Sequence, residues 1–327
     1  MASLHRPALL VRLAVAAAAA LATTVAFAQA YPTQPIKFIV PYTTGTGMDT
    51  IARVTGSKLA ARLGQPVVVE NRPGASGNIG AAMVAKAPAD GHTLMVTANT
   101  MLMAASIYRN VPYDVLQDFT PITMAAYGTM ALVATTKSGI DSVDTLIRRA
   151  KAEPNKITYG SPGIGTPHHL AMELFKDVSA TEILHVPYKG TAGAVTDLLA
   201  GQIDLMFFPV HTAAPHVKSG KMKALAVGSA KRHPAAPDVP TLKELGVPNV
   251  EVEAWYAFFG PKDLPAPILE KLSGELRSIL GEAEVRDMLN KSGLDTASST
   301  PQELKAIVER DFPRWAAVIK KNNITAE

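Results

Sequence analysis

The stretch that decides the fold is residues 36–70, IKFIVPYTTGTGMDTIARVTGSKLAARLGQPVVVE. Its apolar start, Ile36–Val40, is typical of a buried strand, and apolar residues then recur at helical spacing until Gly64 ends the helix. Residues 66–70 predict a second strand, and residues 93–97 predict a third after a glycine-rich loop. This strand–helix–strand order predicts the α/β class, with a parallel sheet covered by helices on both faces.

A second alternating block follows the first. The chain ends in a helical pattern that contains Pro313, where the loss of a backbone hydrogen bond predicts a break or kink and a separate last turn. The predicted strands of this block are residues 130–135, 157–160, 183–187, 203–208 and 223–227, and the predicted helices are residues 143–152, a helix from about residue 166, and residues 192–199.

The first 28 residues predict a signal peptide. Arg6 and Arg12 precede a short apolar run, and the sequence Ala-Phe-Ala at residues 26–28 is the small-x-small pattern before a cleavage site. The run is shorter than the roughly 20 apolar residues of a membrane span. We therefore expect cleavage after Ala28 and export of the mature chain to the periplasm.

Composition excludes several classes of function. The chain has no cysteine, which excludes disulfides, thiolate metal sites and a cysteine nucleophile. Without Arg6 and Arg12 the chain keeps 30 basic residues against 28 acidic ones, a net charge of about +2 that gives no argument for nucleic-acid binding. A mature chain of about 300 residues with 47% hydrophobic residues can build two domains.

Two glycine-rich loops carry the functional signal. Residues 41–49 (PYTTGTGMD) and residues 160–167 (GSPGIGTP) each follow a predicted strand and open a helix. The first N–H groups of a helix have no internal acceptor and, together with the helix dipole, favour an anion such as a carboxylate. One such loop in each block predicts a ligand site in a cleft between two domains.

Enzyme and metal interpretations have weaker support. Gly45-x-Gly47-x-x-Thr50 resembles a dinucleotide-binding turn with Glu70 about 20 residues on, but the third glycine is missing. No Gly-x-Ser-x-Gly motif of hydrolases occurs. The pairs His168–His169 and His211–His216 lack the spacing of metal ligands on one helix face. We expect no catalysis, no cofactor and no metal ion.

The sequence resembles the substrate-binding receptors of tripartite tricarboxylate transporters, also called Bug receptors. The resemblance covers essentially the whole mature chain. The matching stretches are residues 31–36 (YPTQPI), 63–75 (LGQPVVVENRPGA), 78–80 (NIG), 111–114 (VPYD), 185–190 (HVPYKG), 204–207 (DLMF) and 237–241 (PDVPT).

This resemblance implies a periplasmic binding protein fold of type II, a two-domain Venus flytrap joined by two crossing strands. Domain 1 would comprise residues 30–127 and 227–327, and domain 2 residues 128–226. The protein would act as a monomer that binds a small organic acid and presents it to the membrane permease of a tripartite tricarboxylate-type transporter. The resemblance also implies a ligand carboxylate held chiefly by backbone N–H groups.

The implied ligand-binding residues come from four segments. Departures from the family pattern at Phe208, His168 and His211 favour a chain-specific ligand, for example an aromatic or nitrogen-containing acid. Phe208 has an alternative place in the core, because alternate strand residues face opposite sides. The expected residues are Tyr42, Thr43, Thr44, Gly45, Thr46, Gly47, Asp49, Thr97, Ala98, Asn99, Ser161, Gly163, Ile164, Gly165, Thr166, His168, His169, Phe208 and Pro209.

Two other functions remain open at this point. A receptor of the same fold could report its ligand to a signalling protein instead of a permease. An exported hydrolase or dehydrogenase is the alternative from a different class.

Overall fold

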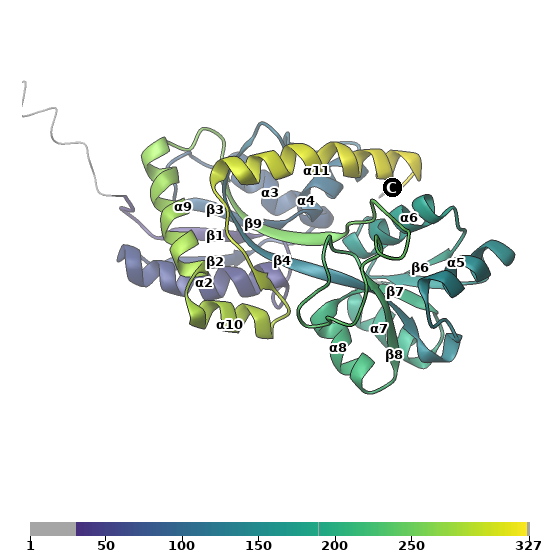
Figure 1. The fold of residues 1–327 in the computed structure, drawn as a ribbon. Coiled ribbons are helices and arrows are strands. Elements are labelled where there is room, and N and C mark those ends of the chain that lie inside the picture. Colours follow the sequence, from purple (N-terminus) through teal and green to yellow (C-terminus); the bar gives the residue numbers. More distant parts are fainter. Residues whose placement is uncertain (1–30, 189, 326–327) are drawn as a thin grey trace, which may run out of the picture.

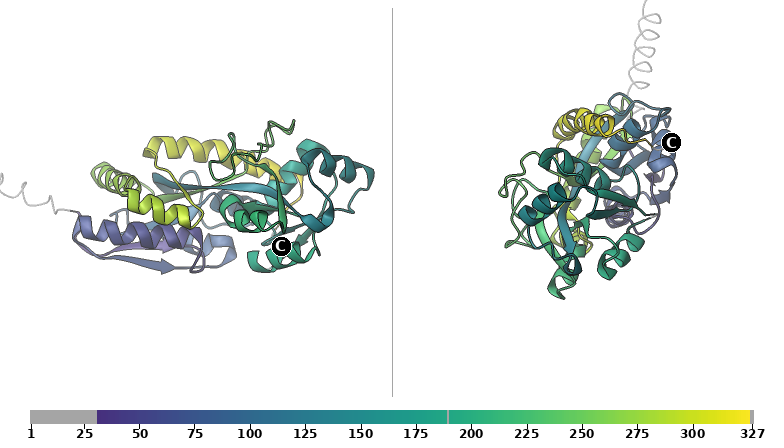
Figure 2. Two further views of the ribbon diagram at one scale, coloured as in Figure 1. Left: turned by 60° about the horizontal axis from the view of Figure 1, so that its bottom comes forward. Right: turned by 90° about the vertical axis from the view of Figure 1, so that its right-hand side faces the viewer.

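The computed structural model describes residues 31–188 and 190–325, so the predicted signal peptide lies outside the described residues. Two sheets lie side by side along the molecule, each with helices on both faces (Figures 1 and 2). Within the described residues, no helix combines the length and the apolar composition needed to cross a bilayer.

The first half of the molecule is built on the sheet β2-β1-β3-β9-β4. The strands β1, β2 and β3 run parallel, as the sequence predicts, and β9 is antiparallel to both of its neighbours. Its elements are β1 (Ile36–Val40), α2 (Gly47–Leu63), β2 (Val67–Asn71), a 3₁₀ turn (Ala75–Gly77), α3 (Asn78–Ala85), β3 (Thr93–Ala98), α4 (Thr100–Ile107), β9 (Glu253–Pro261), α9 (Ala266–Leu280), α10 (Ala283–Lys291), β10 (Asp295–Thr296) and α11 (Pro301–Lys321).

Two hydrophobic clusters hold this sheet between its helices. Buried side chains of α2, α9 and α10 pack on one face, and those of α3, α4 and α11 pack on the other. The predicted stop of α2 is confirmed, since Gly64 caps it in the left-handed region with φ 69°.

The second half of the molecule repeats this layered plan around β4, β7, β8, β5 and β6. The helices α5 and α6 cover one face of the sheet, and α7 and α8 cover the other. Its elements are β4 (Phe119–Thr135), a 3₁₀ turn (Thr136–Ser138), α5 (Val143–Ala152), β5 (Thr158–Ser161), α6 (Pro167–Ser179), β6 (Leu184–Pro187), α7 (Thr191–Ala200), β7 (Leu205–Pro209), α8 (Val210–Lys218) and β8 (Met222–Val227).

Strand β4 connects the two halves. It pairs with β9 from Phe119 to Thr129 in the first sheet, and with β7 and β8 from Met130 onwards in the second. The return passes from the end of β8 through Gly228, whose N–H donates to the carbonyl of Met130 at 2.7 Å, and enters β9 at Glu253. Two neighbouring strand segments therefore cross between the sheets.

Helix α11 corrects one expectation from the sequence. It is one element from Pro301 to Lys321 with Pro313 inside it, so the predicted separate last turn is wrong. Its last turns bury Trp315, Val318 and Ile319 in the cluster that holds α5 and α6 of the second half. That burial stabilises the helix beyond the proline and offsets the lost hydrogen bond.

Candidate functional site

A cavity of about 250 Å³ lies where β4 passes from one sheet to the other. Larger hollows of about 360, 390 and 470 Å³ are lined by neither glycine-rich loop, so we take the smaller one as the candidate site. Its lining residues come from both halves and are Gly47, Met48, Ala98, Asn99, Thr100, Gly128, Met130, Pro167, His168, Pro209, Thr212, Ala254, Tyr256, Ser292, Gly293 and Leu294.

Four helices begin at this cavity. The helices α2 and α4 reach it from the first half, and α6 and α8 reach it from the second. The N-terminal end of each helix carries a partial positive charge and N–H groups without intrahelical acceptors. None of the described residues that line the cavity has a charged side chain. The arrangement suits an anion held by backbone dipoles.

The first loop is folded around Asp49. This carboxylate accepts hydrogen bonds from the Gly45 N–H at 3.0 Å, from Arg53 Nε at 3.1 Å and from Asn71 Nδ2 at 3.0 Å. Burial tends to raise the pKa of Asp49, but the Arg53 and Gly45 contacts outweigh burial and lower it. Gly45 has φ 81°, a conformation that glycine adopts without strain. Asp49 thus shapes the loop and does not line the cavity.

The second loop is held by side chains of its own half. The Ser161 hydroxyl accepts the Gly163 N–H at 3.2 Å, and the Thr166 hydroxyl caps α6 by accepting the His169 N–H at 3.4 Å. His169 Nδ1 accepts the Gly165 N–H at 3.0 Å. These bonds fix the turn that brings the start of α6 to the cavity.

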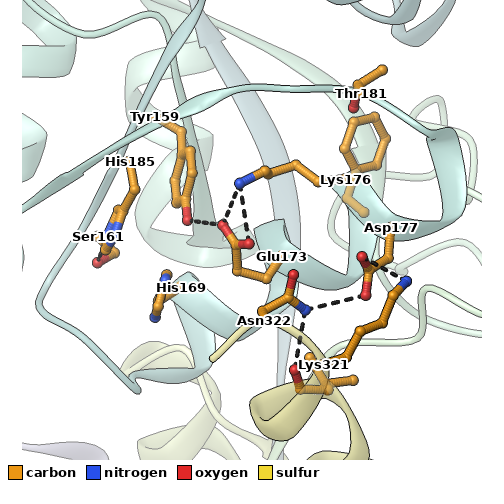
Figure 3. A network of polar contacts seen from close by, with 12 residues as sticks. Tyr159, Ser161, His169, Glu173, Lys176, Asp177, Thr181, His185, Lys321 and Asn322 are labelled. Atoms are coloured by element: carbon orange, nitrogen blue, oxygen red, sulfur yellow. Dashed lines mark hydrogen bonds and ion pairs between the residues drawn. The ribbon is translucent and has the colours of Figure 1, made fainter. Parts of the chain in front are cut away.

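A buried aromatic and ionic network supports this turn (Figure 3). The rings of His169 and His185 stack with their centroids 4.1 Å apart, and His185 stacks on Tyr159 at 4.7 Å. The Tyr159 hydroxyl donates to Glu173 at 2.6 Å, and Lys176 pairs with the same carboxylate at 2.8 Å. Burial lowers the pKa of both His169 and His185 to about 4, so both rings are neutral near pH 7.

The structure brings only some of the predicted residues to the cavity wall. Of the other loop residues, some hold the turns through hydrogen bonds, whereas Thr43, Thr44 and Ile164 are exposed to solvent. The predicted residues that line the cavity are Gly47, Ala98, Asn99, His168 and Pro209, and those that do not are Tyr42, Thr43, Thr44, Gly45, Thr46, Asp49, Thr97, Ser161, Gly163, Ile164, Gly165, Thr166, His169 and Phe208.

Phe208 is the clearest correction among these residues. It is 2% exposed and belongs to the hydrophobic cluster of β4, α7 and α8. Strand residues alternate between faces, and this one faces the core, which is the alternative that the sequence left open. The expectation that its ring selects the ligand is therefore wrong for this structure.

Several lining residues were missed by the sequence analysis. Tyr256 lies on β9 among the aromatic residues Trp255, Phe258 and Phe259, and burial raises its pKa to about 12. Residues 292–294 follow α10 and reach the cavity from far along the chain. Neither Tyr256 nor residues 292–294 belong to a glycine-rich turn of the kind that marked the two loops.

A histidine cluster lies beside the cavity. His211 of α8 and His233 approach Asp295 of β10, with His233 Nε2 2.7 Å and His211 Nε2 3.7 Å from its carboxylate. Burial would raise the pKa of Asp295, but the two imidazoles hold it well below its usual range. His233 Nδ1 accepts the Ala235 N–H at 3.1 Å, so its proton lies on Nε2. That proton occupies the position a metal ion would need, and the cluster is better described as a polar contact between the halves.

The fold and the cavity together define a class of protein. Two α/β halves joined by crossing strands, with a cavity at helix N-termini between them, are the architecture of periplasmic binding proteins of type II.

Comparison with known proteins identifies the family within this class. The sequence profile of the tripartite tricarboxylate transporter family receptors matches residues 51–324. BugT of Bordetella pertussis is 35% identical over 296 residues, which cover 90% of this chain and 91% of BugT. The chain belongs to this receptor family, and it is a solute-binding receptor and not an enzyme.

Solved structures agree with this assignment. A structure from R. palustris with adipate is 34% identical, with a TM-score of 0.78 over 90% of this chain and 99% of that one. MatC from Rhodopseudomonas palustris with bound malate is 29% identical, with a TM-score of 0.74 over 88% of this chain and 100% of that one.

Proposed function

We propose that this protein is a periplasmic receptor that binds a small organic carboxylate in its interdomain cavity and delivers it to the permease of a tripartite tricarboxylate-type transporter. The observation that carries the proposal is the uncharged cavity at four helix N-termini. A carboxylate placed there gains hydrogen bonds and dipole attraction without burial of a lysine or arginine. Similar proteins solved with adipate and malate support the ligand class.

We propose that the mature protein begins near Gln29 and consists of two domains, residues 30–127 with 227–327 and residues 128–226. The crossing at β4 and Gly228 supports a hinge between them. In this assignment the end of α11 belongs to domain 1 but packs on α6, where Lys321 pairs with Asp177 at 2.8 Å. Cleft opening would therefore have to loosen the end of α11 as well. A monomer with one cavity is sufficient for this function.

Ligand-dependent thermal stability tests the binding proposal. A ligand at one hundred times its Kd stabilises a protein by roughly 2.7 kcal/mol, which raises the melting temperature measurably. We expect short mono- or dicarboxylates to raise it, and the matched amides, such as succinamide beside succinate, to leave it unchanged. No shift with any acid, or equal shifts with the amides, would contradict the proposal.

Uptake measurements separate transport from sensing. Deletion of the gene in its host should abolish uptake of the identified acid, and restoration of the gene should restore it. Normal uptake together with lost transcriptional response to the acid would favour the sensing alternative.

A further inference from the structure

Asn99 is the polar side chain of the cavity whose orientation is fixed by the structure. It is 1% exposed, precedes α4, and donates from Nδ2 to the Glu253 carbonyl at 3.0 Å. The Glu253 carbonyl can accept a hydrogen bond from Asn99 Nδ2 but not from Asn99 Oδ1. Exchange of the nitrogen and oxygen positions of the Asn99 side chain would therefore break this bond. Its Oδ1 is therefore the atom left over, and it is buried without a hydrogen-bond partner among the described residues.

A buried acceptor without a partner costs free energy, and such atoms in native structures are commonly satisfied by a ligand or by water. Asn99 lines the cavity beside Thr100, the first residue of α4. The N–H groups of that helix end are donors for a carboxylate, whereas Asn99 Oδ1 would repel one. The same corner of the cavity thus offers donors for an anion beside an acceptor that needs a donor.

The opposite wall has a similar uncharged group. His168, the second residue of α6, lines the same cavity, and its Nδ1 is also buried without a partner within the described chain. Burial lowers the pKa of His168 to about 4, so the ring is neutral near pH 7. A neutral imidazole can donate to or accept from an uncharged polar group of a ligand.

The electrostatics of the cavity restrict which donor the ligand brings. Four helix N-termini contribute partial positive charge, and none of the described lining residues is anionic. An ammonium group would be disfavoured there, whereas a hydroxyl would not. The donor that fits Asn99 Oδ1 is therefore an O–H close to the carboxylate.

We propose, on the basis of the proposed carboxylate-binding function, that the preferred ligand is a small hydroxy acid, and that Asn99 selects it by accepting a hydrogen bond from the hydroxyl beside the carboxylate. The α4 N–H groups hold the carboxylate. His168 contacts the polar part of the ligand from the other half of the molecule.

Matched ligand pairs test this proposal by isothermal titration calorimetry. Lactate is compared with propionate, malate with succinate, and alanine serves as the ammonium analogue of lactate. We expect the hydroxy acid of a pair to bind about tenfold more tightly or better than its deoxy partner, and alanine to bind weakly. Equal affinities within each pair would overturn the hydroxyl inference and leave the carboxylate receptor intact. Absence of binding by every acid would instead contradict the proposed function itself.

Two variants separate selection from support of the fold. In Asn99→Ala the hydroxy acid and its deoxy partner should bind with affinities that differ by less than about twofold, even if both affinities drop. Asn71→Ala is the matched control, because Asn71 Nδ2 holds the first loop through the Tyr42 carbonyl at 3.1 Å and Asp49 at 3.0 Å, outside the cavity. It should weaken both acids of a pair alike and keep their ratio. An unchanged ratio in Asn99→Ala would overturn the role of Asn99, and if that variant fails to fold, the wild-type pairs still decide the hydroxyl preference.

Discussion

Replacement of Gly47 by valine tests whether the first loop contributes to ligand affinity. Gly47 is the first residue of α2, and a Cβ atom there would lie 3.2 Å from Leu294 Cδ2 and 3.2 Å from the Tyr256 ring. Both neighbours line the cavity, so the valine would push on the wall of the proposed ligand site. Overpacking of this kind costs about 1–3 kcal/mol of stability.

The expected loss of affinity is larger than a change in packing alone would give. A hydrogen bond to a charged group contributes about 1.5–3 kcal/mol, and each 1.4 kcal/mol is a factor of ten. Loss of one N–H contact to the carboxylate should therefore raise the Kd by about 10- to 100-fold. Calorimetric titration with an acid that stabilises the wild type, beside thermal melting of the unliganded protein, measures both effects.

Gly56→Val is the control for overpacking. Gly56 lies on the same helix, and its added Cβ would lie 3.1 Å from Val67 Cγ1, away from the cavity. This variant should lose stability on a similar scale and keep its affinity. If Gly47→Val binds within twofold of the wild type, or if Gly56→Val loses as much affinity, the assignment of the first loop to the ligand is refuted.

Further predictions concern the core, a helix, the buried histidines and export. Phe208→Ala should lower the free energy of unfolding by about 3–5 kcal/mol in urea unfolding and leave the order of affinities for different acids unchanged. An altered order of affinities with unchanged stability would show that the ring contacts the ligand. Gly274→Ala lies in the exposed middle of α9, where a Cβ would meet nothing within 4 Å, and it should stabilise by about 0.5–1 kcal/mol; a lower melting temperature would contradict this. Burial lowers the pKa of His185 from 6.5 to about 4, so the unfolded chain takes up the proton first and stability should fall as the pH drops from 6.5 towards 4. His185→Gln should reduce the slope of the melting temperature over that window without removing it, because His168 and His169 have similarly lowered pKa values, and an unchanged slope would show that His185 does not contribute. Mass spectrometry of protein from the host should find an N-terminus at or near Gln29, whereas an intact Met1 would disprove cleavage.

Local signals explain why much of the fold was predictable. The start of β1, the stop of α2 at Gly64 and the helix α5 follow from apolar spacing and capping residues, which act over a few positions. The length of β4 was not predictable in this way. Only residues 130–135 were assigned, whereas the strand runs from Phe119 to Thr135, because the earlier part is held by non-local pairing with β9.

The candidate site was predictable in its backbone but not in its side chains. Glycine-rich turns before helices mark where N–H groups converge, and Gly47 and His168 do lie at the cavity. Which face of a strand or loop turns inward depends on packing that the sequence does not state locally. Phe208 faces the core for this reason, and Tyr256 reaches the cavity from the strand β9, which carries no binding motif.

Asp49 shows why a residue type alone does not reveal its role in an anion site. A carboxylate in the first turn of α2 would be expected to repel a bound acid, since both would compete for the same helix end. In the structure Arg53 pairs with Asp49 at 2.9 Å, and the Gly45 N–H and Asn71 amide take up its remaining acceptor positions. The charge is therefore compensated within the loop, and Gly47 and Met48 at the start of α2 line the cavity. An acid in the proposed anion-binding loop is thus compatible with binding when a cation one helical turn away neutralises it, as Arg53 does here.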